Sequence, residues 1–375
     1  MAISTLDLLK LLKNENIDFF TGVPDSLLKY FSYSLSDHID QNNHIIAANE
    51  GNAIAIAAGY HIATNKIPVV YMQNSGLGNA INPLLSLCDP EVYSIPMLLM
   101  IGWRGQSGHI DANQHKKMGR IQEDILKTLE LPFETITGDQ NDFDKIKRMI
   151  NLSKSKNEPA IILVQKDSFL TYPNNKNQVV DSDLTREQAL RMILSDLPNH
   201  YFTVCSTGKI SREVYEIRDE LELGHNHDFL TVGSMGHCSS IALGLSLGNP
   251  SNHIICIDGD GSLIMHMGSL ATMAKVASKN IHYVLINNFA HESVGGQETA
   301  SKYVDISRLA ESCKFKNYYF ANNYSTLNKQ WAEFIKEPFS FFEIRVMQGA
   351  RQSLGRPKLK LNLLKEGFKD LYIDN

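Results

Sequence analysis

The chain has 375 residues, of which 43% are hydrophobic and 21% are charged, and its formal net charge at pH 7 is −5. This composition is typical of a soluble globular protein with two domains, and without a block of like charges it favours neither a nucleic-acid partner nor an anionic membrane. The longest apolar run, IPMLLMIGW at 95–103, is too short to span a bilayer, and five cysteines without a CxxC pair favour reduced thiols and a cytoplasmic location.

Helical and extended patterns alternate along the chain. The first 18 residues place apolar side chains at helical spacing, which predicts an amphipathic helix rather than a signal peptide. Short continuous apolar runs then alternate with helical stretches, as in parallel sheets that are buried on both faces. The predicted strands are 18–21, 44–48, 67–73, 96–102, 133–136 and 160–165 in the first half, and 201–206, 228–232, 253–258, 281–287, 316–321 and 340–346 in the second.

A polar stretch that contains Pro173 separates the two halves. We interpret residues 173–184 as a linker between domains, because polar residues and a proline are typical of such connections. The expected fold class is therefore α/β, with two doubly wound parallel-sheet domains at 1–172 and 185–375 and no middle domain.

Polar residues follow two apolar runs of the second half. Asp260 lies in the GDGS sequence after the run at 253–258, and Asn288 follows the run at 281–287. Because neighbouring parallel strands end at the same edge of a sheet, a carboxylate and an amide oxygen can meet there on one hard cation such as Mg²⁺. The glycines of this turn let the backbone approach an anion, as at many phosphate sites.

These residues resemble the thiamin diphosphate-binding motif of the thiamin diphosphate-dependent decarboxylases. The resemblance implies that the second half is the diphosphate- and Mg²⁺-binding domain and that the first half is the pyrimidine-binding domain. On this pattern Mg²⁺ is held by the side chains of Asp260 and Asn288 and by the carbonyl of Ala290. The family often has glycine at the last position, so alanine can take this place only if its φ is not positive.

The resemblance extends to other residues around the cofactor. The STGKIS loop at 206–211 resembles a phosphate-contacting loop, and TVGSMGHCSS at 231–240 resembles the segment that bends the cofactor. The residues so implied in cofactor binding are Thr207, Lys209, Gly233, Met235, Gly259, Gly261 and Ser262. Met235 would lie between the two rings, with an ordinary core methionine as the alternative, and the Gly233 carbonyl would accept a hydrogen bond from the 4′-amino group.

Glu50 stands in the first turn of an alanine-rich helical pattern after the predicted strand at 44–48. A glutamate there can simply interact favourably with the helix dipole. The resemblance implies instead that Glu50 hydrogen-bonds to N1′ of the aminopyrimidine and activates the cofactor by sharing a proton with it. In this family the pyrimidine domain of one subunit faces the diphosphate domain of another, which implies a homodimer or a higher homo-oligomer with active sites at the subunit interface.

In its small size, without a middle domain, the chain resembles the family members that act on short, doubly acidic 2-oxo acids. Strings such as GVPDSLL (22–28), IPMLLMIGWRG (95–105) and NNFAHESVGGQET (287–299) extend the resemblance over most of the chain. The resemblance implies decarboxylation of 3-phosphonopyruvate to phosphonoacetaldehyde and CO₂ in phosphonate biosynthesis. 3-Sulfopyruvate is the alternative substrate, although enzymes for it are often split into two subunits. A non-catalytic nucleotide-binding protein on the same fold is a second alternative.

Several side chains are candidates for the substrate site. Arg104 in GWRGQSG is the candidate for the phosphonate, because a guanidinium matches its geometry, with a solvated surface arginine as the alternative. Asp25 and Ser26 lie on a strand-end loop where related decarboxylases keep an acid near the cofactor, although Asp25 could instead cap a helix that starts at Ser26. His115 and His291 are candidate proton donors, with a non-catalytic loop position as the alternative for each.

Overall fold

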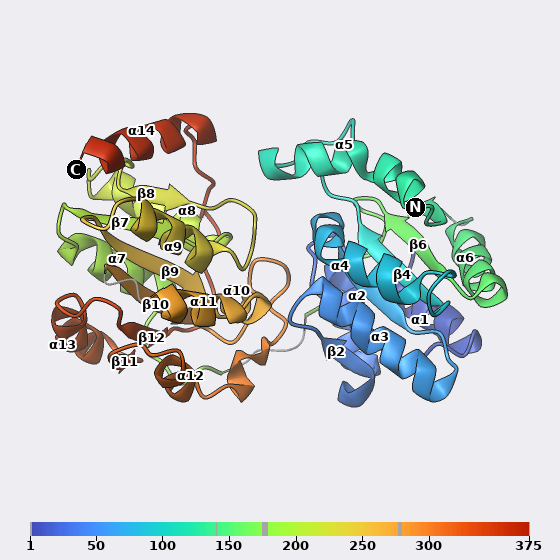
Figure 1. The fold of residues 1–375 in the computed structure, drawn as a ribbon. Helices are drawn as coiled ribbons and strands as arrows, with labels where there is room; N and C mark the ends of the chain where they lie inside the picture. The colour runs from blue at the N-terminus through green and yellow to red at the C-terminus, as the bar shows by residue number, and fades with distance from the viewer. Residues whose placement is uncertain (1, 140, 175–178, 277–279, 375) are drawn as a thin grey trace. The chain divides into compact units, whose positions relative to one another are not determined.

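The computed structural model describes residues 2–139, 141–174, 179–276 and 280–374. The chain divides into two compact units, Met1–Lys176 and Asn177–Asn375. Each unit contains one six-stranded parallel sheet with helices along it (Figure 1). The stretch interpreted as a linker, 173–184, includes residues 175–178, which lie outside the described residues.

The sheet of the N-terminal unit has the strand order β2-β1-β3-β4-β6-β5. Its strands are β1 (Phe20–Gly22), β2 (His44–Ile46), β3 (Val69–Gln73), β4 (Met97–Gly102), β5 (Phe133–Ile136) and β6 (Pro159–Val164). Its helices are α1 (Thr5–Asn14), α2 (Lys29–His38), α3 (Glu50–Thr64), α4 (Leu77–Pro83), α5 (Asn113–Thr128) and α6 (Asp142–Lys156).

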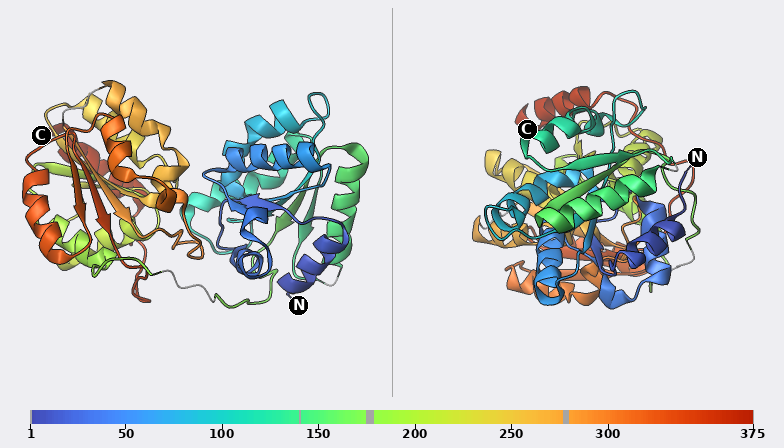
Figure 2. Two further views of the ribbon diagram at one scale, coloured as in Figure 1. Left: turned by 90° about the horizontal axis from the view of Figure 1, so that it is seen from below. Right: turned by 90° about the vertical axis from the view of Figure 1, so that its right-hand side faces the viewer.

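Helices bury both faces of this sheet. One apolar core joins the sheet to α1, α2 and α6, through side chains such as Leu12, Phe31 and Ile150. A second core lies against the other face and joins α3, α4 and α5, through side chains such as Ile54 and Leu126. Figure 2 shows the sheet of this unit edge-on between its helices. Burial on both faces explains why its central strands are continuous apolar runs.

The C-terminal unit repeats this architecture, with the strand order β11-β12-β10-β9-β7-β8. Its strands are β7 (Tyr201–Cys205), β8 (Asp228–Leu230), β9 (His253–Gly259), β10 (Ile281–Asn287), β11 (Tyr318–Ala321) and β12 (Phe341–Arg345). Its helices are α7 (Arg186–Asp196), α8 (Lys209–Glu220), α9 (Cys238–Gly248), α10 (Asp260–Met265), α11 (Gly268–Val276), α12 (Ile306–Ser312), α13 (Tyr324–Phe334) and α14 (Leu361–Asp374).

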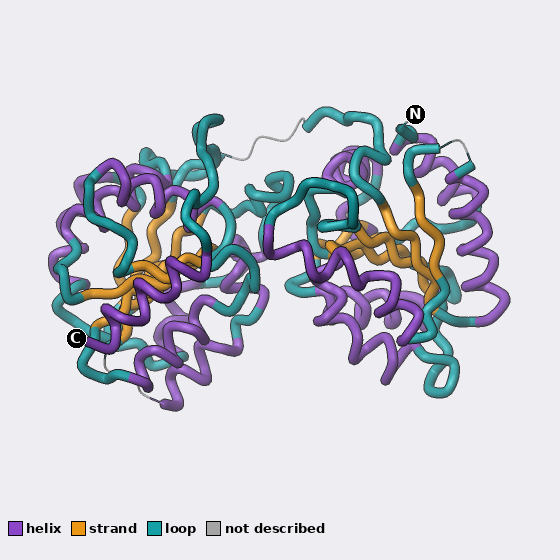
Figure 3. Tube along the Cα trace, turned by 90° about the horizontal axis from the view of Figure 1, so that it is seen from above, coloured by secondary structure: helices purple, strands orange, loops and turns teal. Residues whose placement is uncertain are grey.

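Two cores again cover the two faces of the sheet. The first joins α7, α8 and α13, with Trp331 fully buried, and the second joins α9, α11, α12 and α14. In Figure 3, which colours the Cα trace by secondary structure, the strands of each unit (orange) have helices (purple) beside them. β9 and β10 pair in parallel with Gly259 opposite Ile286, so the residues that follow both strands emerge at one edge of the sheet.

The expected fold class is confirmed, including the absence of a domain between the two sheets. Each predicted strand overlaps an observed strand, with ends that differ by no more than two residues. The amphipathic helix predicted at the start of the chain is α1, where the Ser4 side chain caps the first turn. All five cysteines are free, and four of them are buried. Among the described helices, none has the length and apolarity that crossing a membrane requires.

Candidate active site

In the N-terminal unit, Glu50 is the first residue of α3 and is only 5% exposed. The helix begins here because Asn49 accepts a hydrogen bond from the backbone N–H of Asn52. The Oε2 atom of Glu50 accepts a hydrogen bond of 2.8 Å from Nδ2 of Asn79. Burial raises the pKa of Glu50, although the Asn79 hydrogen bond opposes that shift. A carboxyl group of this kind holds a proton more readily than an exposed one.

Gly76 lies directly against the Glu50 carboxyl group. A Cβ atom at residue 76 would stand 2.1 Å from Oε1 of Glu50, which is far inside van der Waals contact. Because residue 76 has no side chain, there is room for the Glu50 carboxyl group beside the start of α4. Asn79 and Gly76 both belong to the NSGLGNA stretch at 74–80, whose role beside Glu50 the sequence analysis missed.

Asp25 follows β1 and is 1% exposed. Its Oδ2 atom accepts hydrogen bonds from the backbone N–H groups of Leu27 (2.8 Å) and Leu28 (3.3 Å), whereas its Oδ1 atom has no hydrogen-bond partner among the described residues. Burial raises the pKa of Asp25 to about 6, even though Arg104 and the backbone N–H groups act in the opposite direction. The expected alternative, a cap on a helix starting at Ser26, is wrong, because α2 starts at Lys29 and has Leu28 as its N-cap.

Arg104 lies just after β4, and its side chain is 14% exposed, so it is not a solvated surface arginine. Its Nη1 atom donates to Ser26 Oγ at 2.7 Å, while Nε and Nη2 donate to the two carboxylate oxygens of Asp111 at 2.7 and 2.5 Å. Asn74 holds the backbone of Arg104 through two hydrogen bonds. The structure therefore brings Arg104 and Ser26 together and adds Asp111.

Asp111 was missed because it lies seven residues beyond Arg104 in an irregular loop, where no periodicity relates the two. Burial alone would raise the pKa of Asp111, but the Arg104 guanidinium and two backbone N–H groups lower it well below its usual range. His115 lies in the first turn of α5, where its backbone carbonyl adjoins Gly105.

In the C-terminal unit, Asp260 is the first residue of α10 and is 3% exposed. Its Oδ2 atom accepts hydrogen bonds from the hydroxyl groups of Thr299 and Ser301, the second at 3.0 Å. Burial raises the pKa of Asp260 to about 6, because these hydroxyl groups and backbone N–H groups only partly offset the cost of desolvating the charge. Thr299 and Ser301 follow Asp260 by about 40 residues, and no sequence signal links them to it.

Asn288 and Ala290 lie in the turn that follows β10. The Asn288 side chain donates from Nδ2 to Glu292 at 3.0 Å and accepts at Oδ1 from the Ala290 N–H at 3.1 Å. The residue with a positive φ in this turn is Phe289, at 57°, and not Ala290. Ala290 thus meets the backbone requirement set out above for a carbonyl ligand. Its carbonyl also accepts a hydrogen bond of 2.9 Å from the Glu292 N–H.

Further residues expected around the cofactor lie in the first turn of α10 and in the loops beside it. A Cβ atom at Gly261 would stand 2.8 Å from the His291 ring and 3.3 Å from the end of Met235, so these side chains meet over Gly261. Ser262 accepts a hydrogen bond from the Gly236 N–H at 3.1 Å. Burial lowers the pKa of His291 to about 4, so its ring is neutral at pH 7.

The remaining expected residues belong to three strand-end loops. Gly259 ends β9, Gly233 lies in the turn between β8 and α9, and Thr207 precedes Gly208, whose φ of 98° marks the sharp turn into α8. Lys209 is the first residue of α8, and its Nζ atom lies 3.1 Å from Oε1 of Glu292. Lys209 therefore forms an ion pair with Glu292, a residue that the sequence pattern did not indicate.

These residues fit a magnesium diphosphate site by their donor chemistry. Asp260 supplies a buried carboxylate whose charge is only partly compensated, Asn288 supplies an amide oxygen and Ala290 supplies a carbonyl oxygen. Hard oxygen donors of this kind suit Mg²⁺, which usually shares its coordination sphere with phosphate oxygens and water. Within the described residues, there is no cluster of three or more His, Cys, Asp or Glu side chains that could hold a metal ion by themselves.

Each of the two units matches a model of one enzyme family. Residues 5–125 match the thiamine pyrophosphate enzyme, N-terminal TPP binding domain, and residues 206–344 match the thiamine pyrophosphate enzyme, C-terminal TPP binding domain. Phosphonopyruvate decarboxylase of Streptomyces viridochromogenes is 30% identical over 95% of this chain and 92% of its own length. The Streptomyces hygroscopicus protein of the same name is 30% identical over 98% and 94%. Sulfopyruvate decarboxylase of Methanosarcina acetivorans is 30% identical over 82% of each chain.

Proposed function

Because the chain belongs to the thiamine pyrophosphate (thiamin diphosphate) enzyme family, we propose that it is a carboxy-lyase that converts 3-phosphonopyruvate to phosphonoacetaldehyde and CO₂ in phosphonate biosynthesis. The observation that carries this proposal is the similarity to two phosphonopyruvate decarboxylases over nearly the full length of both chains. The geometry supports it with a buried acid at the start of α3, an oxygen-ligand site after β9 and β10, and an arginine beside a serine after β4.

When bound, thiamin diphosphate supplies a carbon nucleophile and accepts the electrons that CO₂ leaves behind. Asp260, Asn288 and Ala290 would hold Mg²⁺ in this protein. The residues that would hold the cofactor itself are Thr207, Lys209, Gly233, Met235, Gly259, Gly261 and Ser262. Glu50 would hydrogen-bond to the aminopyrimidine N1′ and exchange a proton with it. Its raised pKa supports this role, because a carboxyl group exchanges a proton best when its pKa is near the working pH.

Arg104 and Ser26 would bind the phosphonate group of the substrate. Arg104 is already oriented by Asp111, so its remaining donor capacity has a fixed direction before substrate arrives. Asp25 would transfer a proton during the reaction, since its pKa of about 6 is close to neutrality and its Oδ1 atom lacks a partner among the described residues. His291 is neutral at pH 7 and would act through its ring N–H, and His115 is a second candidate donor.

Decarboxylation of 3-sulfopyruvate is the second candidate function. A single chain favours the phosphonate substrate on the family pattern, but a sulfopyruvate decarboxylase also matches both halves of this chain at the same identity. Chain fusion therefore does not separate the two substrates. A phosphonate dianion gains more from a guanidinium than a sulfonate monoanion does, which is why we favour 3-phosphonopyruvate.

The test is a side-by-side assay of CO₂ release from 3-phosphonopyruvate, 3-sulfopyruvate and pyruvate. We expect kcat/KM for 3-phosphonopyruvate to exceed that for pyruvate roughly a hundredfold, because pyruvate leaves buried donors unpaired at about 1–3 kcal/mol each. Arg104→Ala is expected to lower this ratio, whereas equal losses for both acids would remove Arg104 from the phosphonate site. Faster turnover of 3-sulfopyruvate would replace the proposed substrate and leave the cofactor assignment unchanged.

A further inference from the structure

Glu292, whose side chain is 13% exposed, is a carboxylate that the proposed reaction does not use directly. Its Oε2 atom accepts from Asn288 Nδ2 at 3.0 Å, and its backbone N–H donates to the Ala290 carbonyl at 2.9 Å. Glu292 thus contacts two of the three residues that would hold Mg²⁺. Neither the GDGS motif nor the paired asparagines point to a residue in this place.

The Asn288 side-chain amide has its NH₂ end toward Glu292 and its oxygen toward the Ala290 N–H. A carboxamide has an oxygen end and an NH₂ end of nearly the same shape, but only the oxygen can ligate Mg²⁺. A carboxylate can accept hydrogen bonds but cannot donate them, so Glu292 attracts the NH₂ end of Asn288. The oxygen end is thereby turned away from Glu292, where it accepts from the Ala290 N–H at 3.1 Å.

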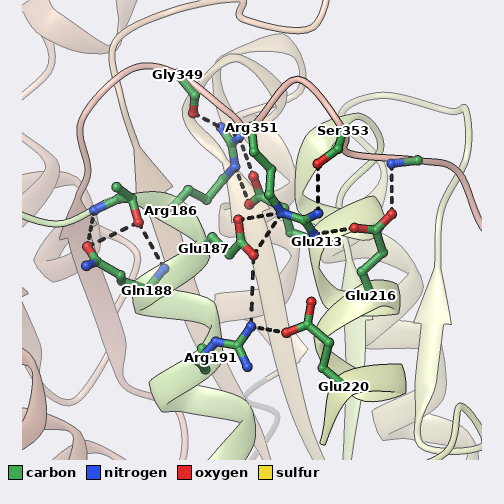
Figure 4. Close-up of polar contacts among 12 residues, drawn as sticks. Arg186, Glu187, Gln188, Arg191, Glu213, Glu216, Glu220, Gly349, Arg351 and Ser353 are labelled. Carbon is green, nitrogen blue, oxygen red and sulfur yellow. Dashed lines mark hydrogen bonds and ion pairs between the residues drawn. The ribbon is translucent and has the colours of Figure 1, made fainter.

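Other parts of the unit hold Glu292 itself in place. Arg186, on α7, is 4% exposed and pairs with both Glu292 and Glu213. Figure 4 shows Arg186 between Glu213 and the carbonyl of Gly349. Lys209, on α8, pairs with Oε1 of Glu292 at 3.1 Å. Two cations therefore face two carboxylates, and Glu292 has little freedom to move.

The segment after β12 also contacts Glu292 and Asn288. Gly349 donates its N–H to Oε1 of Glu292 at 2.6 Å, and the Gln348 side chain donates to the backbone carbonyl of Asn288 at 3.0 Å. Arg351 anchors this segment by pairing with Glu187 on α7 and Glu216 on α8 (Figure 4). The turn after β10 is thus held by two helices and by the segment that follows the last strand.

We propose that Glu292 is a positioning residue that orients the Asn288 amide and thereby sets the affinity of the site for Mg²⁺. This inference rests on the proposed function, because it requires Asn288 to be a Mg²⁺ ligand. Partners that orient metal ligands typically change metal affinity by about 10- to 100-fold when they are replaced.

The test measures Mg²⁺ binding by calorimetry at saturating thiamin diphosphate, without any assay of activity. Glu292→Gln replaces the carboxylate by an amide that can face Asn288 with either end, so we expect Mg²⁺ affinity to fall about 10- to 100-fold. Glu292→Asp keeps the charge opposite Arg186 but withdraws it from Asn288 by one methylene. Glu292→Asp is the test variant if Glu292→Gln does not fold. It is also expected to bind Mg²⁺ more weakly than the wild-type protein does.

Asp228→Asn is the matched control, because Asp228 forms a buried ion pair with Arg218 in the same unit. It is expected to lower the unfolding temperature without changing Mg²⁺ affinity. An equal loss of Mg²⁺ affinity in Asp228→Asn and Glu292→Gln would show that any lost ion pair weakens the site, and would overturn the proposal.

A double-mutant cycle with Asn288→Asp separates orientation from general electrostatics. An aspartate at residue 288 offers an oxygen at either end, so nothing remains for Glu292 to orient, and its carboxylate faces that of Glu292. We therefore expect Glu292→Gln in the Asn288→Asp background to relieve a like-charge contact and to leave Mg²⁺ affinity unchanged or higher, whereas equal losses in both backgrounds would overturn the proposal. If the wild-type protein shows no Mg²⁺-dependent binding of thiamin diphosphate, the proposed function fails and this inference fails with it. Normal wild-type binding with unchanged Glu292 variants overturns the inference alone.

Discussion

Glu50 combines a buried carboxyl group with a defined set of neighbours, and this combination separates a chemical role from a helix-end role. One oxygen accepts from Asn79, and the other adjoins Gly76. A glutamate that only improved the start of α3 would not need this burial, because the interaction with a helix dipole is worth a few tenths of a kcal/mol even at exposed sites. Burial raises the pKa of Glu50, which favours proton exchange with a bound base.

We therefore predict that Glu50→Gln keeps thiamin diphosphate binding but lowers kcat by a factor on the order of 10²–10⁴, because the amide cannot exchange a proton with N1′. The direct measurement is the rate of hydrogen–deuterium exchange at C2 of the bound cofactor by NMR. Exchange at the wild-type rate in the variant would show that Glu50 serves only the helix end.

Asp25 allows a prediction of how stability depends on pH. Burial raises its pKa in the folded protein to about 6, from an ordinary value of 3.8. Between these two pH values the folded protein binds the proton more tightly than the unfolded chain, so the contribution of Asp25 to the free energy of unfolding is present at low pH and is lost as pH rises through about 6. The full loss corresponds to about 3 kcal/mol.

We expect Asp25→Asn to remove this dependence. Relative to wild type, the free energy of unfolding of Asp25→Asn should increase by up to about 3 kcal/mol between pH 4 and pH 7.5, as measured by urea unfolding. Parallel pH profiles for wild type and Asp25→Asn would contradict the raised pKa.

At the scale of elements, the NSGLGNA stretch that packs against α3 contains two glycines, Gly76 and Gly78, that can be compared by substitution with alanine. A Cβ atom at Gly76 would stand 2.1 Å from the Glu50 carboxyl group, whereas one at Gly78, inside α4, would meet nothing within 4 Å. Gly76→Ala is therefore expected to lower the free energy of unfolding by about 1–3 kcal/mol. Gly78→Ala is expected to raise it by about 0.5–1 kcal/mol, because alanine is the better helix former.

Chemical unfolding of both variants checks this prediction, and the C2 exchange rate then shows whether Gly76→Ala also displaces the Glu50 carboxyl group. Equal stabilities of the two variants would mean that α3 and this stretch do not pack as closely as the structure has them.

The strands and the loops between them differ in how well the sequence predicts them. The central strands were predictable because burial on both faces turns each of them into a continuous apolar run, and such a run can be seen without its neighbours. The strand-end residues Asp260 and Asn288 were predictable for the same reason. Asp111, Thr299 and Glu292 were not, because their partners depend on the path of irregular loops, which no local periodicity encodes.

At the scale of the whole molecule, Glu50 and Asp260 belong to different compact units of the chain. The proposed function places both at one cofactor, and we expect them to come from different subunits of a homo-oligomer. This arrangement predicts complementation between two inactive variants. Glu50→Gln keeps a normal Asp260, and Asp260→Asn, which is expected to lose Mg²⁺ and diphosphate, keeps a normal Glu50.

If each site takes Glu50 from one subunit and Asp260 from its partner, a mixed dimer of the two variants contains one site with both native residues and one with neither. Random reassembly of equal amounts makes half of the dimers mixed, so activity should recover to about a quarter of the wild-type level. The experiment is co-unfolding and refolding of the two variants, followed by the CO₂ assay, with each variant refolded alone as the control. No recovery in mixed dimers, verified with two affinity tags, would show that both residues of a site come from the same subunit.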